Sequence, residues 1–221
     1  MNLNLSRIHY PITTLGPGQR IGIWFQGCSI RCPGCISVDT WSHTGKHVSV
    51  DEVISSISQW LPLAEGITIS GGEPFEQPAA LKLLAARLRP IFAGDILVYS
   101  GFALDKIQNH LNEMIGLIDV VMTEPFLKDE SQTMPLRGSD NQKLIVLTQL
   151  GKDRYSGLDS VQKQPNKRLD IMFDDESNTV WIAGIPQRGD LEKISLLLNS
   201  QGLLNRTSEE SGGGIASCSK S

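Results

Sequence analysis

Cysteine is scarce in this sequence: four of the 221 residues are Cys, and three of those four lie within eight positions of one another. The chain has no apolar run near the ~18 residues that suggest a membrane span. Its first residues lack the basic start, apolar stretch and small-residue cleavage site of a secretory signal. These absences predict a cytoplasmic protein with no membrane partner, where clustered cysteines more often bind metals or carry redox chemistry than form disulfides.

Basic residues are also outnumbered, since 20 Lys and Arg stand against 24 Asp and Glu and give a formal net charge of −4. A protein that binds nucleic acid by neutralising phosphates needs an excess of Lys and Arg, so nucleic acid is not an expected partner. No internal repeat of about 20 to 50 residues is present, which argues against solenoids and propellers. The apolar fraction of 40% and the charged fraction of 20% are typical of a globular enzyme.

Short apolar segments alternate with amphipathic ones along most of the chain. The apolar segments predict strands at 20–27, 66–70, 95–100, 117–123 and 143–148. The amphipathic segments predict helices at 49–61, 78–88 and 103–114, the first with Ser49 and Glu52 in capping-box spacing. Alternating strands and helices form βα units and a largely parallel sheet. The predicted fold is α/β, an open, partial TIM-like barrel of about six βα units, too few for a complete barrel.

The last part of the chain has a different pattern. Two apolar segments, 169–173 and 179–185, flank a turn-rich stretch and predict a hairpin. Residues 189–202 predict a final helix, with Asp190 as its N-cap and Gly202 as its stop.

We expect a single domain over residues 1–204, with an N-terminal hairpin, a cysteine loop and the C-terminal hairpin and helix. Residues 205–221 are polar and predict a disordered tail. The fourth cysteine, Cys218, lies in this tail and is expected to have no role in the site.

The clustered thiols are Cys28, Cys32 and Cys35, in a loop that follows the predicted strand 20–27. Structural zinc sites usually have four protein ligands, and iron–sulfur clusters are commonly held by four cysteines. Three cysteines would leave one cluster iron without a protein ligand and free to bind an exchangeable group. Two other interpretations are open: buried cysteines acting only as small apolar residues, and a zinc site completed by His43 or His47.

A second motif, Gly71-Gly72-Glu73-Pro74, follows the predicted strand 66–70. Adjacent glycines let a backbone approach a ligand closely, and the proline fixes the exit direction of the chain. A plain strand-to-helix turn accounts for the same residues.

Together, the C-SIR-C-PG-C loop and the GGEP turn resemble the motifs of radical S-adenosylmethionine (SAM) enzymes. The resemblance implies that Cys28, Cys32 and Cys35 bind a 4Fe–4S cluster. It also implies that residues 71–74 contact the methionine amino group of SAM, chiefly through backbone groups. A non-catalytic metal-binding module is the alternative from a different class.

The segment LGPGQRIGIWFQGCSIRCPGC is similar to the opening of the glycyl-radical activating enzymes, above all the anaerobic ribonucleotide reductase activating family. DTW (39–41), VYSGF (98–102) and LRGSDNQKLI (136–145) resemble the same family, so the similarity runs from about residue 15 to 147. The chain departs from the family pattern at Ile36 and Ser37, where a Tyr-Asn pair is common, and at Thr123, where an acidic residue is expected.

This narrower resemblance implies a glycyl-radical enzyme or another substrate protein as partner, and a flavodoxin- or ferredoxin-like electron donor. A radical SAM enzyme acting on a small molecule, nucleotide or peptide is the alternative, with a pocket built by residues after 147.

Four further residues are candidates for SAM or partner contacts: Ser100, Gly101, Asn141 and Gln142. For Ser100 and Gly101 a helix cap is the alternative, and for Asn141 and Gln142 a surface loop is. Arg137 could pair with a carboxylate. Phe75 lies beside the glycine pair, although core packing is the favoured role for it. No catalytic side chain is assigned.

Overall fold

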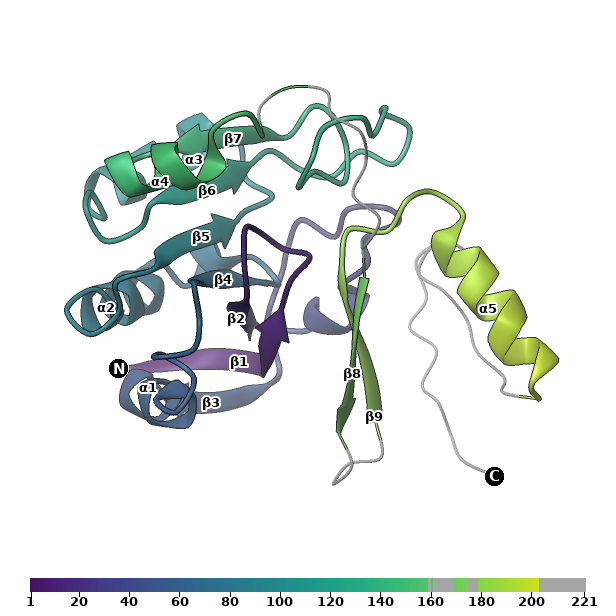
Figure 1. Ribbon diagram of the computed structural model, residues 1–221, viewed down its shortest axis with the longest axis horizontal. Coiled ribbons are helices and arrows are strands. Elements are labelled where there is room, and N and C mark those ends of the chain that lie inside the picture. The colour runs from purple at the N-terminus through teal and green to yellow at the C-terminus, as the bar shows by residue number, and fades with distance from the viewer. Residues whose placement is uncertain (159, 161–168, 175–178, 203–221) are drawn as a thin grey trace.

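The computed structural model describes residues 1–158, 160, 169–174 and 179–202. Its main element is a seven-stranded sheet in the order β3-β1-β2-β4-β5-β6-β7 (Figure 1). The strands are β1 (Asn2–Ile12), β2 (Arg20–Phe25), β3 (Lys46–Ser49), β4 (Gly66–Gly71), β5 (Asp95–Tyr99), β6 (Val120–Thr123) and β7 (Lys143–Val146). The predicted tail, with Cys218, lies outside the described residues.

The centre of the sheet is parallel and its edges are antiparallel. Strands β2, β4, β5 and β6 form three consecutive parallel pairs. Strand β1 pairs antiparallel with both β2 and β3, so the expected N-terminal hairpin is present. Strand β7 runs antiparallel to β6, where the sequence pattern predicts another parallel strand. The α/β class is confirmed, but the described part of the sheet contains four parallel strands and not six βα units.

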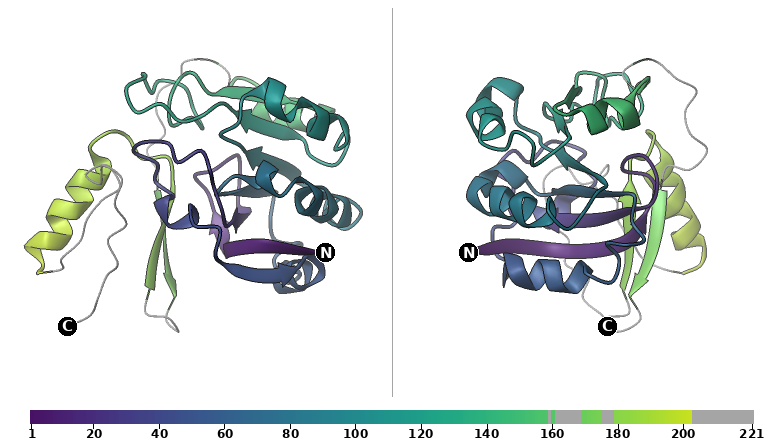
Figure 2. Two further views of the ribbon diagram at one scale, coloured as in Figure 1. Left: turned by 180° about the vertical axis from the view of Figure 1, so that it is seen from behind. Right: turned by 60° about the vertical axis from the view of Figure 1, so that its left-hand side comes forward.

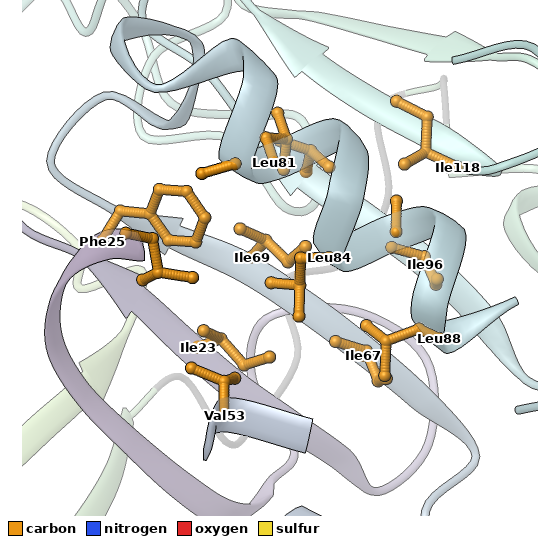
Figure 3. Close-up of a cluster of buried hydrophobic side chains, with 14 of the residues drawn as sticks. Ile23, Phe25, Val53, Ile67, Ile69, Leu81, Leu84, Leu88, Ile96 and Ile118 are labelled. Carbon is orange, nitrogen blue, oxygen red and sulfur yellow. The ribbon is translucent and has the colours of Figure 1, made fainter. Parts of the chain in front are cut away.

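Three helices cover one face of this sheet: α1 (Val50–Ile57), α2 (Pro78–Leu88) and α3 (Leu104–Asn112). The predicted capping box begins α1, because Ser49 Oγ accepts from Glu52 N at 3.2 Å and Glu52 Oε2 accepts from Ser49 N at 2.7 Å. Figure 3 shows the core beneath α2, where Ile23, Ile67 and Leu84 meet between the sheet and the helix. Uniformly apolar central strands are typical of a sheet with both faces covered.

On the opposite face, a buried polar network lies near the starting ends of the parallel strands. Arg20 on β2 and Asp95 on β5 form an ion pair of 2.7 Å between Nη2 and Oδ2, with both side chains fully buried. Tyr155, from α4 (Gln149–Tyr155), donates to Asp95 Oδ2 over 2.7 Å, and Thr68 Oγ1 accepts from Arg20 Nε at 2.6 Å. This network fills the end of the sheet farthest from the cysteine loop.

The predicted C-terminal hairpin is confirmed as β8 (Leu169–Asp174) and β9 (Thr179–Gly184), an antiparallel pair separate from the main sheet. The last helix, α5 (Asp190–Ser200), lies on the side of this hairpin that faces away from the main sheet (Figures 1 and 2).

The N-cap of α5 is Gly189, at φ 80°, and not Asp190 as expected from the sequence. The left-handed conformation suits glycine and places Asp190 in the first turn, where its carboxylate accepts from Gln187 N at 3.0 Å. None of the described helices is both long enough and apolar enough to cross a membrane.

Candidate functional site

The predicted motifs meet at one edge of the sheet. The carboxyl ends of parallel strands lie together, and ligands in open α/β sheets bind outside these ends. Strand β2 leads into the cysteine loop, β4 into the GGEP turn and β5 into Ser100 and Gly101. Strand β6 leads into the long 124–142 loop, which carries Asn141 and Gln142.

The cysteine loop is fixed by main-chain hydrogen bonds. Gly27 N donates to Thr40 O at 2.8 Å, and Cys28 N donates to Trp41 O at 3.2 Å, so the loop is tied to the 3-10 turn at Val38–Thr40. Cys28 is buried, whereas Cys32 and Cys35 are partly exposed, and all three thiols are free. The loop thus presents three sulfur atoms from a braced backbone.

Burial raises the pKa of each thiol, and that of Cys35 to about 11. The charges of the other cysteines act in the same direction on Cys32 and Cys35, while a hydrogen bond from Phe126 N opposes the increase in the pKa of Cys32. The free loop therefore keeps protonated thiols at neutral pH. Metal binding to cysteine requires the thiolate, so it must release these protons.

The two glycines of the GGEP turn are required by backbone packing. A Cβ on Gly72 would lie 2.0 Å from Gly27 O, and one on Gly71 would lie 2.3 Å from Phe25 O. Gly72 N donates to Phe25 O, and Glu73 N donates to Gly27 O, each at 2.8 Å. The turn therefore lies directly against the entrance to the cysteine loop, which gives the glycine pair a structural reason besides the expected approach to a ligand.

The Glu73 side chain is fully buried and links the ends of β4 and β5. Its carboxylate accepts hydrogen bonds from Phe75 N (2.9 Å), Ser100 Oγ (2.9 Å) and Gly101 N (2.7 Å). Burial raises the pKa of Glu73 to about 7, although these hydrogen bonds act in the opposite direction. Glu73, Ser100 and Gly101 are thus brought together, but through bonds with one another.

Asn141 and Gln142 hold the 124–142 loop in shape. Asn141 Nδ2 donates to Pro125 O at 2.8 Å. Gln142 Oε1 accepts from Gly138 N at 2.8 Å. Arg137 is buried and donates to the carbonyl oxygens of Gln142 and Leu158. Burial tends to raise the pKa of Asp140, but hydrogen bonds from Thr133 and Met134, with a smaller contribution from the charge of Arg137, lower it overall.

A cavity of about 200 Å³ opens beside the cysteine loop. Of the predicted residues, Cys35, Gly71 and Gln142 line it. The other predicted residues do not line it; they are Cys28, Cys32, Gly72, Glu73, Pro74, Ser100, Gly101 and Asn141.

Most of the remaining cavity lining was not predicted from the sequence. Trp24, Ser70 and Tyr99 face it from three neighbouring strands, and Ile182 and Ile185 face it from the C-terminal hairpin and the segment after it. Alternation along a strand places Trp24 and Phe25 on opposite faces, but the sequence does not tell which face carries a ligand.

Phe75 packs in the main core at 4% exposure, as favoured from the sequence. Its ring lies 6.4 Å from that of His110 on α3. Phe75 is therefore not part of the cavity lining.

The histidines proposed as a fourth zinc ligand lie in different places. His43 Nε2 is 3.8 Å from Glu76 Oε2, and the His43 ring lies against Gly27. His47 is exposed on β3, opposite Asn4. Among the described residues, no three Cys, His, Asp or Glu side chains converge on a position for one metal ion. This argues against a zinc site, whereas in an iron–sulfur cluster each cysteine binds a different iron.

The donor set of the loop fits an iron–sulfur cluster. Iron–sulfur clusters take thiolate ligands, and the loop offers three free thiols close enough to influence one another's charge. Gly34, between Cys32 and Cys35, has φ 77° and turns the chain tightly between these two ligands. Cys28, Cys32 and Cys35 are the residues that would hold the cluster, beside a cavity that could accept a further ligand.

Comparison with known proteins agrees with this site. A family described as the 4Fe-4S single cluster domain matches residues 14–145. The anaerobic ribonucleoside-triphosphate reductase-activating protein of Escherichia coli strain K12 is 32% identical over 144 residues, which cover 61% of this chain and 93% of the relative. The pyruvate formate-lyase-activating enzyme of Staphylococcus aureus strain USA300 is 30% identical over 203 residues, or 85% of this chain and 72% of the relative.

The chain therefore belongs to the 4Fe–4S single cluster domain family. Within the radical SAM superfamily it is of the glycyl-radical activating type, as the sequence motifs indicated.

Proposed function

We propose that this protein is a radical SAM enzyme that activates a glycyl-radical partner, such as an anaerobic ribonucleotide reductase. Cys28, Cys32 and Cys35 would bind a 4Fe–4S cluster, and SAM would bind next to it in the cavity. When bound, the cluster and SAM would supply reductive cleavage to a 5′-deoxyadenosyl radical that abstracts hydrogen, with an electron from a flavodoxin- or ferredoxin-like donor. The observation that carries the proposal is the contact between the cysteine loop and the GGEP turn beside one cavity.

In this role the protein positions and shields the reacting groups. Gly71 lines the cavity and offers its backbone to SAM, while Gly72 and Glu73 hold the cysteine loop at a fixed distance from that backbone. Trp24 and Phe126 give the cavity apolar walls. Such walls exclude water, which would otherwise compete with a reactive species.

The remaining predicted residues differ in whether they reach the cavity or act through other groups. Gln142 lines the cavity and is the side chain of this group best placed to meet SAM. Ser100 and Gly101 act through Glu73, and Asn141 acts through the 124–142 loop. Pro74 begins the 3-10 turn at Pro74–Glu76 and directs the chain away from the site.

The names of the relatives support a protein partner. One relative is named as an activator of anaerobic ribonucleoside-triphosphate reductase and another as an activator of pyruvate formate-lyase. We extend this role to the present chain, as a single cytoplasmic domain over residues 1–204 whose sheet corresponds to a partial barrel.

An activation assay tests the proposal. Anaerobically reconstituted protein, reductant and SAM are mixed with an anaerobic ribonucleotide reductase or, separately, with a pyruvate formate-lyase. We expect a glycyl-radical signal by electron paramagnetic resonance (EPR) in one mixture, and none when the Cys32→Ala variant is used. SAM cleavage without a radical on either partner would contradict activation and favour a different substrate.

One observation favours that second candidate, a radical SAM enzyme with a small substrate. Ile185, Pro186 and Arg188, which follow β9, line the cavity. These residues belong to the segment after 147, which is the expected source of a small-molecule pocket. Turnover of a small molecule, with SAM cleavage independent of any glycyl-radical protein, would support this candidate.

A further inference from the structure

We propose that the β8–β9 hairpin is a wall of the SAM cavity and that Asp170 is the positioning residue that holds it there. This inference rests on the proposed function, since it assigns the cavity to SAM. It gives the C-terminal hairpin a role in cosubstrate binding.

Asp170, on β8, joins the hairpin to the turn between β1 and β2. Its side chain is 6% exposed. Oδ2 accepts from Thr13 N at 2.8 Å, from Thr14 N at 3.1 Å and from Thr14 Oγ1 at 2.8 Å. Oδ1 accepts from Thr13 Oγ1 at 3.0 Å. Hydrogen bonds to a charged group contribute more to stability than neutral ones do. Four such bonds from two adjacent residues therefore hold β8 firmly against the turn between β1 and β2.

The surface that receives the hairpin is also the surface that lines the cavity. Ala183 of β9 packs in one small apolar cluster with Ile12, Leu15 and Trp24. Of these, Leu15, Trp24 and Ala183 line the cavity. A shift of the hairpin would therefore change the shape of the cavity directly.

Further contacts hold the hairpin and the segment that follows it. Gln132 Nε2, in the 124–142 loop, donates to Pro186 O at 3.0 Å. The Arg7 guanidinium lies between two indole rings, 5.3 Å from the Trp24 ring centre and 4.6 Å from the Trp181 ring centre. The Arg7 side chain is only 9% exposed, and cation–π contacts are stronger when the cation is shielded from water.

These side-chain contacts matter because the hairpin has no ladder to the main sheet. Among the described strands, β8 and β9 pair only with each other. The cysteine loop, by contrast, is held by main-chain bonds to Thr40, Trp41 and Glu73 that do not involve the hairpin. Release of the hairpin should therefore weaken SAM binding and leave the cluster in place.

The test uses the full-length, reconstituted protein and the Asp170→Asn variant. The amide keeps the size of the side chain but removes its negative charge, and its NH₂ group cannot accept the hydrogen bonds that the replaced carboxylate oxygen accepted from Thr13 or Thr14. Binding of labelled SAM is measured by equilibrium dialysis, iron and sulfide by analysis, and hairpin protection by hydrogen exchange of peptides that cover β8 and β9. Ile171→Thr is the matched control, because Ile171 is the neighbouring residue on β8 and is 58% exposed.

We expect Asp170→Asn to keep about four irons and four sulfides per chain, to lose protection in the hairpin, and to bind SAM at least about tenfold more weakly. Ile171→Thr should match the wild type in cluster content, hairpin protection and SAM affinity. Should Asp170→Asn fail to fold, Thr14→Val, which removes one hydroxyl donor and keeps the backbone N–H, should show the same changes to a smaller degree.

Two results would overturn the inference. One is wild-type SAM affinity in a variant whose hairpin has lost protection, and the other is wild-type protection in spite of the substitution. Failure of the proposed function looks different, because the wild-type protein itself would then lack four irons or would not bind SAM.

Discussion

Ser100 donates a 2.9 Å hydrogen bond from its Oγ to Glu73 Oε1, joining the ends of two neighbouring parallel strands inside the protein. Neither residue lines the cavity, yet both belong to segments that border the site. Glu73, which was expected to contact the cosubstrate, instead holds together the protein segments that border the site. Burial of the same carboxylate outweighs this hydrogen bond and raises the pKa of Glu73, which makes it an informative titrating group of the site.

Glu73 should make stability depend on pH in the metal-free protein. Burial raises its pKa from 4.5 to about 7. The folded protein therefore holds a proton that the unfolded chain releases, so stability falls as the pH rises from about 4.5 to 7 and changes no further above that. Relative to the Glu73→Gln variant, the wild type should lose up to about 3 kcal/mol of unfolding free energy across this range, measured by urea titration.

The control for this experiment is Glu113→Gln. The pKa of Glu113 is lowered by an exposed contact with Lys82, so its titration lies below the range in question. A wild-type minus Glu73→Gln difference that stays constant between about pH 5 and pH 8 would contradict the assignment.

Gly72→Ala should displace the cysteine loop. The new Cβ would lie 2.0 Å from the Gly27 carbonyl oxygen, and backbone cannot move aside as a flexible side chain can. We expect a loss of about 1–3 kcal/mol in unfolding free energy, together with reduced iron uptake on reconstitution. Thermal or chemical denaturation and iron analysis measure the two effects.

Gly116→Ala separates steric clash from backbone strain. Gly116 has φ 77°, and none of the described atoms lies within 4 Å of the position that an alanine Cβ would take, so Ala there brings strain of about 1–2 kcal/mol without a clash. Equal iron uptake by the two variants would show that the contact between Gly72 and Gly27 does not position the loop.

Arg20→Met should be strongly destabilising. The substitution leaves Asp95 buried with part of its charge compensation removed, and breaking a buried pair costs about 3–5 kcal/mol. Arg87→Met is the matched control, because Arg87 forms an exposed pair with Asp51 at 3.7 Å and such pairs contribute about 0–1 kcal/mol. Similar unfolding midpoints for the two variants would contradict a structural role for the network.

Local patterns predicted the elements well where burial is uniform. The central strands read as continuous apolar runs because both of their faces are covered, as for Ile67 and Ile69. The start of α1 was predicted because a capping box lies within four consecutive residues. Strand β3 was not predicted, because it has only four residues and two of them are exposed at the edge of the sheet.

The local motifs of the site were predicted, but its long-range contacts were not. Cysteine spacing and the GGEP turn are local signals, and each of them marks the end of a strand. The hydrogen bonds of Asp170 join residues that are 156 and 157 positions apart in the sequence, and the bond between Ser100 and Glu73 joins residues 27 positions apart. Such long-range pairs leave no periodic signal in one sequence, and neither does the choice of which strand face borders the cavity.

The most direct test of the central claim is anaerobic reconstitution followed by an assay for 5′-deoxyadenosine. With iron, sulfide, dithionite and SAM, the wild-type protein should bind about four irons per chain and form 5′-deoxyadenosine. Cys32→Ala should form none, while Cys218→Ser should match the wild type. A wild-type protein that binds one zinc ion per chain, or that carries a cluster and never cleaves SAM, would contradict the account.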